Sequence, residues 1–190
     1  RKGLKTGGRS CHDMAKLNRA VAWRRLERPY TRKSKYRKYN FVRSVPHSKI
    51  VKFNMGNLRQ EFPITLQLRS NMDIQLRHNS LEAARQSANR LLEKTIGRSG
   101  YRLRVKPYPH HILRNNPLAA GAGADRMSTG MSRSFGKVVG IAAQVHKDQT
   151  VFEIGVNKQH IKTAKEALTR ARNKLPCGGY VKILEEPFKP

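Results

Sequence analysis

Acidic residues and cysteines are both scarce in this sequence of 190 residues. Twelve residues are Asp or Glu, and the two cysteines, Cys11 and Cys177, lie far apart in the sequence. The cysteines form no Cys-x-x-Cys pair, so the sequence disfavours a zinc site and a disulfide framework. A chain with so few cysteines is expected in a reducing compartment, and the cytoplasm is the simplest such setting.

Long apolar runs are also missing. The sequence contains no stretch of about 18 apolar residues, the length that indicates a membrane-spanning helix. The apolar patch near the N-terminus, residues 20–23, is too short for the core of a signal peptide. Neither a membrane nor secretion is therefore expected for this chain.

Motifs for a bound nucleotide or metal are lacking as well. There is no Gly-Lys-Ser/Thr phosphate loop, and Gly121-x-Gly123 lacks the third glycine of a dinucleotide fingerprint. His110 and His111 are adjacent, so in an extended chain they point to opposite sides and make a poor shared metal site. The carboxylates form no acid/base pair by their spacing. We therefore expect no cofactor, no metal and no small-molecule substrate.

Positive charge is what the sequence has in abundance. Its 40 Lys and Arg residues, against 12 acidic residues, give a net charge of +28 and an isoelectric point near 11.1. A free cytosolic protein with this charge attracts polyanions. Since a membrane is not expected, the sequence predicts a protein that binds RNA and is not an enzyme. The alternatives are an RNA-processing or RNA-modifying enzyme and a DNA-compacting protein.

The cations are densest in residues 1–40, which we interpret as a basic N-terminal arm. This stretch has 14 Lys and Arg residues against two acidic residues, a balance of +12. Residues 30–39 (YTRKSKYRKY) interleave cations with aromatic rings, a combination that neutralises phosphates and stacks on unpaired bases. A solvated, disordered charge run is the alternative. The candidate RNA contacts here are aromatic and basic side chains: Tyr30, Arg32, Lys33, Lys35, Tyr36, Arg37 and Lys38.

Residues 41–190 have the hydrophobic patterns of a single α+β domain. Apolar or alternating segments predict strands at residues 50–53, 62–68, 101–105, 138–145, 151–156 and 180–184. A helix is predicted after Asn79, which would cap it together with Glu82 at the capping-box spacing, and Gly97 would end it. A second helix is predicted at residues 158–173. This pattern indicates two main helices packed on an antiparallel or mixed sheet.

A stretch without periodicity, residues 107–137, lies between the two halves of this domain. Long loops inside compact domains are usually functional or disordered. The small residues at 119–124 let the backbone approach another surface closely, and the cations of the loop outnumber its one acidic residue, Asp125. We interpret it as a Gly-rich loop that reaches into RNA, with an idle flexible loop as the alternative.

Several short motifs occur in an order and spacing that resemble one protein family. In and around the loop they are residues 108–114 (YPHHILR), 122–126 (AGADR), 130–131 (GM) and 135–137 (FGK). Flanking motifs are residues 29–32 (PYTR), 48–50 (SKI), 54–57 (NMGN), 77–79 (RHN), 81–85 (LEAAR), 164–168 (AKEAL) and 174–176 (KLP). Together they resemble the large-subunit ribosomal protein family L-sixteen, in its archaeal and eukaryotic branch L-ten-e. The resemblance covers residues 29–184.

The resemblance implies a fold and a function. The implied fold is a two-layer α/β sandwich with a hammerhead-like β motif, and the implied function is that of a structural constituent of the large ribosomal subunit in the cytoplasm. The implied partners are the large-subunit rRNA, the vicinity of the five-S rRNA, tRNA near its acceptor end and the peptidyl-transferase region, and neighbouring ribosomal proteins.

The resemblance also assigns roles to residues. It implies rRNA contacts at Arg32, Lys33, Arg77, His78, Arg114 and Arg126. His110 and His111 join them as RNA or packing contacts, since they make a poor metal site. The same resemblance implies that the loop lies near tRNA, with the candidate residues Gly121, Gly123, Asp125, Arg126, Gly130, Met131, Arg133, Gly136 and Lys137.

Overall fold

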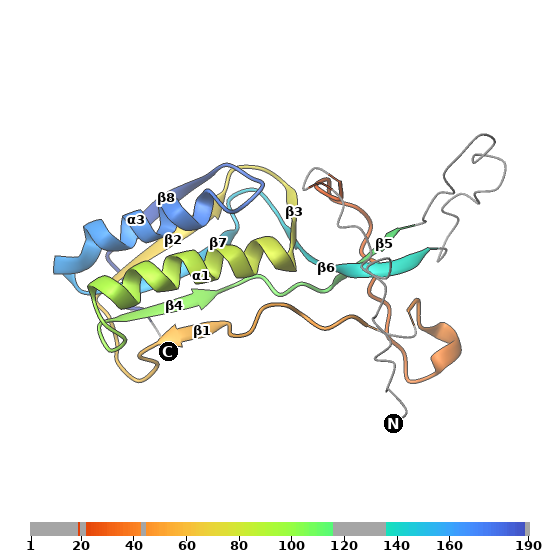
Figure 1. Cartoon of the computed structure of the whole chain (residues 1–190), viewed down its shortest axis with the longest axis horizontal. Helices are drawn as coiled ribbons and strands as arrows, with labels where there is room; N and C mark the ends of the chain where they lie inside the picture. The colour runs from red at the N-terminus through yellow and green to blue at the C-terminus, as the bar shows by residue number, and fades with distance from the viewer. Residues whose placement is uncertain (1–18, 20–21, 43–44, 116–135, 189–190) are drawn as a thin grey trace, which may run out of the picture.

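Two antiparallel sheets and two α-helices make up the fold in the computed structural model, which describes residues 19, 22–42, 45–115 and 136–188. Figure 1 shows an elongated molecule with the helices at one end and a projecting β-hairpin at the other. The structure is a mixed α/β fold with two main helices, as the α+β prediction requires.

The larger sheet has five strands. Their order is β1 (Asn54–Gly56), β4 (Tyr101–Val105), β7 (Thr150–Val156), β2 (Ile64–Ser70) and β8 (Gly179–Leu184). All neighbouring strands are antiparallel. Ile154 of β7 lies opposite both Leu66 of β2 and Leu103 of β4, and all three side chains are buried. Because alternate residues of a strand share one face, these registers place one continuous apolar layer on one side of the sheet.

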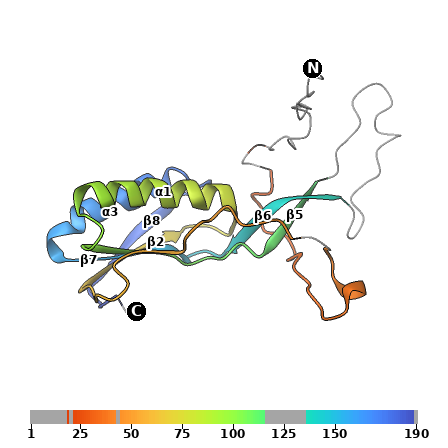
Figure 2. The same ribbon diagram turned by 60° about the horizontal axis from the view of Figure 1, so that its bottom comes forward.

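Two helices cover that apolar layer. They are α1 (His78–Thr95) and α3 (Ile161–Arg172), which lie side by side on one face of the sheet (Figures 1 and 2). The buried side chains recur at helical spacing, among them Leu81, Ala84, Ala88 and Leu92 of α1 and Ala164, Leu168 and Ala171 of α3. A 3-10 turn, η3 (Lys158–His160), occupies the predicted start of the second helix.

The smaller sheet has three strands and extends beyond the helical layer. It consists of β3 (Ile74–Arg77), β6 (Lys137–Val145) and β5 (His111–Asn115), in that order. Asn115 lies opposite Lys137, so β5 and β6 form a hairpin that points away from the helices. Strand β3 contributes four residues to this sheet. On the side of β3 away from β6 no described strand follows, so another segment can pair with that edge.

One predicted strand is wrong in its position. Residues 50–53 form no strand; β1 begins at Asn54, which pairs with Arg104. The preceding segment makes one backbone hydrogen bond to β4, from the Val105 N–H to the Phe53 carbonyl (2.8 Å). Val51, which suggested a buried strand, is 74% exposed. Apolar character alone does not show whether a neighbouring strand is available to pair.

The predicted helix cap is also wrong. Helix α1 begins at His78, directly after β3, and its capping position is Arg77, which makes no side-chain capping bond. Asn79 therefore lies within the first helical turn, and its Oδ1 is buried without a hydrogen-bond partner among the described residues. The Glu82 carboxylate accepts hydrogen bonds from Arg85 instead of the helix terminus. Because no loop separates strand and helix, Asn79 has no room to act as a cap.

The predicted loop at residues 107–137 is shorter than its composition suggests. Residues 111–115 form β5, which pairs with β6, and the side chains of His111, Ile112 and Leu113 are buried. An apolar run this short does not distinguish a strand from a loop until its partner is known. Residues 116–135 of the predicted loop lie outside the described residues.

Candidate nucleic-acid interface

The described part of the predicted arm is held along the smaller sheet. The Gln75 side chain on β3, which is 1% exposed, donates to the Trp23 carbonyl (3.0 Å), and the Gln75 N–H donates to the Arg24 carbonyl (3.0 Å). On β6, the Gln144 side chain donates to the Glu27 carbonyl (2.7 Å). The bond from the Gln75 N–H occupies the open edge of β3, and the three bonds together fix the path of the arm as far as Glu27.

His111 on β5 extends this attachment. Its Nδ1 accepts a hydrogen bond from the Tyr30 N–H (2.9 Å), and its Nε2 lies 3.9 Å from Oε2 of Glu27. Burial lowers the pKa of His111, an effect that Glu27 opposes and Arg114 reinforces. Because only an unprotonated Nδ1 accepts a hydrogen bond, this neutral imidazole is what holds Tyr30 in place.

Beyond Tyr30, cations and aromatic rings contact one another in a continuous series, with one pair of adjacent rings at its centre. We call this group the aromatic ladder; it consists of Arg114, Tyr30, Phe41, Arg32, Tyr39 and Lys38. The Arg114 guanidinium carbon lies 3.8 Å from the centre of the Tyr30 ring, which stacks on Phe41 with a centroid distance of 4.9 Å. The Arg32 guanidinium carbon lies 5.9 Å from the Phe41 ring and 5.6 Å from the Tyr39 ring. Lys38 Nζ is 5.0 Å from the Tyr39 ring.

The aromatic ladder is carried by a closed turn. The Phe41 N–H donates to the Arg32 carbonyl (3.2 Å), and the Tyr30 hydroxyl donates to the Phe41 carbonyl (3.0 Å). Inside the turn, the Ser34 N–H donates to the Asn40 side chain, and a 3-10 helix, η2 (Arg37–Tyr39), follows. The turn exposes its basic and aromatic side chains, namely Arg32, Lys33, Lys35, Tyr36, Arg37, Lys38 and Tyr39. A preorganised surface of this kind suits phosphates and stacked bases.

Arg77 and His78 lie where the two sheets meet. The Arg77 guanidinium carbon is 5.8 Å from the Trp23 ring, so this residue also contacts the arm. His78 is buried, and its Nδ1 accepts a hydrogen bond from the Lys49 N–H (3.4 Å). Burial, with the nearby charges of Lys49 and Arg77, lowers the pKa of His78. A side chain at Gly140 would place its Cβ 3.4 Å from His78 Nε2, so glycine leaves room for the imidazole.

The structure separates the two adjacent histidines, as predicted from their spacing. His111 points into the fold, whereas His110 is exposed. Of the predicted tRNA-proximal residues, Gly136 and Lys137 are described, and Lys137 is exposed at the start of β6. The other loop candidates lie outside the described residues: Gly121, Gly123, Asp125, Arg126, Gly130, Met131 and Arg133.

Several residues of this interface were not predicted from the sequence. Trp23, Gln75 and Gln144 attach the arm, and Phe41 completes the central ring pair. Phe41 lies one residue beyond the predicted arm boundary, so the interleaving of cations and rings could have been extended to include it. Nothing in the local sequence distinguishes the two glutamines from ordinary surface residues.

The chemistry of the described residues is that of binding. Within the described ranges, no group of three or more His, Cys, Asp or Glu side chains is arranged to hold a metal ion. None of the helices in the part of the chain that the structure describes is long and apolar enough to cross a membrane. The Glu27 carboxylate lies beside His111, and among the residues that the structure describes no ion pair joins an acidic side chain to the exposed cations of the turn.

Comparison with known proteins assigns the chain to a family. A family model described as "Ribosomal protein L16p/L10e" matches residues 29–181. The chain belongs to this ribosomal protein family. Large ribosomal subunit protein uL16 of Methanococcus maripaludis is 49% identical over 161 residues, which cover 84% of this chain and 90% of that relative. The protein of the same name from Methanocella arvoryzae is 50% identical over 141 residues, 74% of this chain and 82% of that relative.

The region that matches the L16p/L10e family begins at the interface. It runs from Pro29 to residue 181, so it contains the aromatic ladder, both helices and every strand except the last three residues of β8. Trp23, Arg24 and Glu27, which attach the arm to the smaller sheet, lie before the matched region. The aromatic ladder is thus within the matched region, whereas part of the attachment of the arm precedes it.

Proposed function

We propose that this chain is a structural constituent of the large ribosomal subunit and binds large-subunit rRNA through the aromatic ladder and the turn that carries it. Membership of a ribosomal protein family supports this function, as do the names of the two relatives. The observation that carries the proposed interface is the continuous series of cations and rings from Arg114 to Lys38, on a turn fixed to a rigid sheet. The protein is not an enzyme, and its site of action is the cytoplasmic ribosome.

The proposed contacts divide by exposure. Exposed cations of the turn, with Arg77 and Arg114, neutralise phosphates, and Tyr36, 62% exposed, offers its ring to unpaired bases. Tyr30, held between Arg114 and Phe41, keeps these groups in position. His110, which is exposed, contacts RNA on the side of the chain opposite to His111. The buried His78 and His111 act by holding the frame on which these contacts are mounted.

The position of the smaller sheet and its loop within the large subunit is also part of the proposal. We infer that the smaller sheet is the hammerhead-like motif and that its hairpin carries the loop toward tRNA acceptor ends, near the five-S rRNA and neighbouring ribosomal proteins. The register of Asn115 with Lys137 supports this, because it makes the loop leave and re-enter the fold at the tip of the projecting hairpin.

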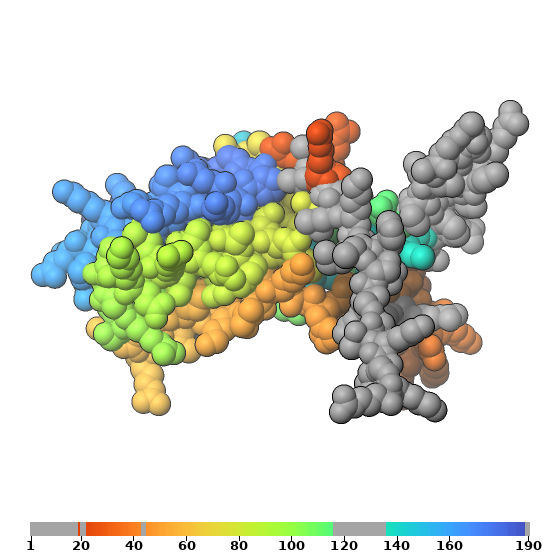
Figure 3. All heavy atoms as spheres, in the orientation of Figure 1, coloured from red at the N-terminus to blue at the C-terminus, as the bar shows by residue number. Residues whose placement is uncertain are grey.

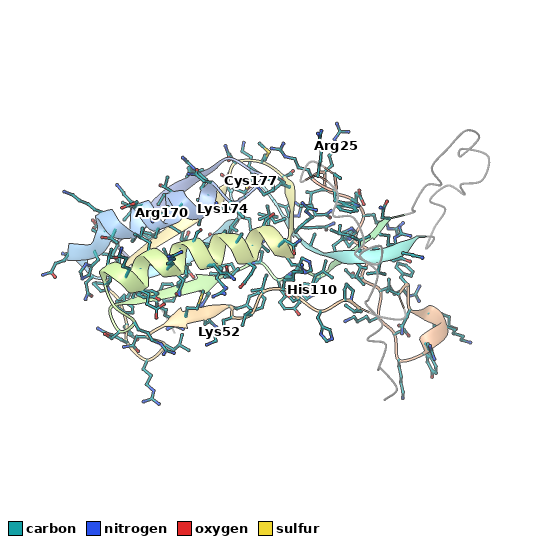
Figure 4. All side chains as sticks on the ribbon, viewed as in Figure 1. Arg25, Lys52, His110, Arg170, Lys174 and Cys177 are labelled. Atoms are coloured by element: carbon teal, nitrogen blue, oxygen red, sulfur yellow. The ribbon has the colours of Figure 1, made fainter. Side chains whose placement is uncertain are left out.

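The proposal is tested by removing the same charge from two ends of the molecule. One variant replaces Lys33, Lys35, Arg37 and Lys38 by Gln on the turn. The matched control replaces Lys158, Lys162, Lys165 and Lys174 by Gln, four exposed cations of η3, α3 and the residues after α3. Figures 3 and 4 show α3 on the part of the molecule away from the turn. The turn variant is expected to reduce the slope of log affinity for large-subunit rRNA against log salt by up to about 3, since each neutralised phosphate contributes roughly 0.7 to 0.9.

In cells, tagged wild-type chain is expected to sediment with large subunits, and the turn variant to leave those particles at lower salt than the control variant. A wild-type chain absent from large-subunit particles would overturn the function. Equal effects of the two variants on the salt slope would overturn the assignment of the interface while leaving the function intact.

A further inference from the structure

A second aromatic surface lies on the segment that connects the two sheets. Between β4 and β5, residues 106–110 alternate strictly: Lys106, Tyr108 and His110 are exposed, whereas Pro107 and Pro109 are buried. The alternation places the three exposed side chains on one side of an extended chain. Two prolines fix the backbone φ of this segment, so little conformational freedom is left to lose when a ligand binds.

The exposed rings form a column anchored in the core. Tyr108 stacks on Phe53 with a centroid distance of 5.2 Å and an angle of 25°, and Phe53 packs against the core. On Tyr108, the His110 ring follows with a centroid distance of 4.6 Å. Tyr108 nevertheless remains 49% exposed. The partly buried Phe53 supports the other two rings, which remain exposed and leave an aromatic surface that no described residue covers.

Cations lie beside this column. The segment before β1 runs alongside it, because Phe53 accepts a backbone hydrogen bond from Val105 (2.8 Å). On that segment Lys49 and Lys52 are exposed, and Figure 4 shows Lys52 and His110 along the same edge of the molecule. Rings flanked by cations on a rigid backbone match an unpaired nucleotide, whose base stacks while its phosphates are neutralised.

We propose that Tyr108 and His110 form a stacking site for one unpaired RNA base, with Lys49 and Lys52 contacting the adjoining phosphates. This site is separate from the aromatic ladder: it uses the side of the β5 segment that His110 faces, opposite His111. The inference rests on the proposed function in one respect, namely that the chain binds RNA at all.

The test uses the full chain and two RNA probes of equal length, one single-stranded with a central 2-aminopurine and one fully duplex. Tyr108→Ala removes the exposed ring, Tyr108→Phe keeps it, and Tyr180→Ala removes a tyrosine of similar exposure on β8 as the matched control. Tyr108→Ala is expected to weaken binding of the single strand by on the order of tenfold, the usual effect of losing one base–aromatic stack. The duplex, whose bases are already paired, should bind as before.

Tyr108→Phe and Tyr180→Ala should both behave like the wild type. Ultraviolet cross-linking of the bound single strand should label the peptide that contains Tyr108 and His110. Unchanged single-strand affinity of Tyr108→Ala, an equal loss for both probes, or labelling confined to the aromatic ladder would each overturn the stacking site. A wild-type chain that binds neither probe would overturn RNA binding itself, which is a distinguishable result.

Discussion

Gly56 shows how one residue can be determined by packing that is not visible in its neighbourhood in sequence. It lies in the edge strand β1 with φ of +84°, and a Cβ built there would be 2.2 Å from the carbonyl oxygen of Tyr101. Gly97, which follows α1, has nearly the same φ of +81°, but apart from its chain neighbours no described residue places an atom within 4 Å of its would-be Cβ. The two glycines therefore separate backbone strain from steric overlap.

Replacing each of these glycines by alanine should give different losses of stability. Gly97→Ala is expected to lower the free energy of unfolding by about 1 kcal/mol, the cost of a left-handed conformation for an L residue. Gly56→Ala carries the same strain and also a backbone clash, so its loss should be about 4 kcal/mol. Denaturant unfolding of the two variants measures both values. Equal losses would show that β1 moves away from β4 without cost.

At the scale of elements, the arm and the smaller sheet are joined through a titratable side chain. The pKa of His111 is lowered from the ordinary value of 6.5 in the folded chain, mainly by burial. As the pH falls below that ordinary value, the unfolded chain binds a proton before the folded chain does. Stability is therefore full above pH 6.5 and is lost progressively as the pH falls through the lowered pKa.

Attachment of the arm should consequently weaken in mild acid. The amide exchange rate of Tyr30, whose N–H is donated to His111, is expected to rise relative to the rates of the β5 amides as the pH falls from 7 to 5, after correction for intrinsic rates. His111→Asn keeps a side-chain oxygen as acceptor and should flatten this dependence. His47→Asn, at an exposed histidine, is the control. A wild-type Tyr30 with pH-independent protection would contradict the mechanism.

Elements with their own periodicity were predictable, whereas those defined by a partner were not. Strand β4 and the apolar face of α1 follow from alternation and from helical spacing, and Gly97 ends the helix as predicted. Strand β1 has three residues, too few to establish a period, and β5 is as long as β4 but does not alternate apolar and polar residues. Asn79 failed as a cap because the direct passage from strand to helix is a property of the tertiary fold.

The residues of the candidate site were likewise predictable only where the local sequence itself carries the pattern. Composition identifies the turn, since cations interleaved with rings mark an RNA-binding segment in the sequence itself. Composition does not distinguish His110, which is exposed, from His111, which is buried and holds Tyr30. Gln75 and Gln144 contribute only through contacts with residues more than fifty positions away, so no local pattern could reveal them.

At the scale of the whole molecule, stability and binding are located at different ends. The apolar core lies between α1, α3 and the larger sheet, while the turn and the hairpin of β5 and β6 project from the other end (Figure 1). Because few core side chains come from the projecting hairpin, changes at its tip should affect binding more than folding. The loop between residues 115 and 136 offers the sharpest test of this separation.

Deleting residues 121–130 removes about half of the connection between β5 and β6. The ends of that connection are held by the pairing of Asn115 with Lys137, so the gap can be bridged without moving either strand. Halving a loop changes its closure free energy by only about 0.6 kcal/mol, and the deleted chain should therefore fold with nearly unchanged stability. Large subunits carrying it should contain the chain at normal stoichiometry but bind tRNA more weakly and form peptide bonds more slowly.

Arg126→Ala with Arg133→Ala, which removes charge and keeps loop length, should give a milder form of the same defect, because close backbone approach and phosphate contact contribute separately. Purified subunits with each variant, quantified for the chain and assayed for tRNA binding and peptidyl transfer in parallel, provide the measurement. Normal activity at normal occupancy would refute a functional loop, and loss of the chain from the particles would make the loop an assembly anchor instead.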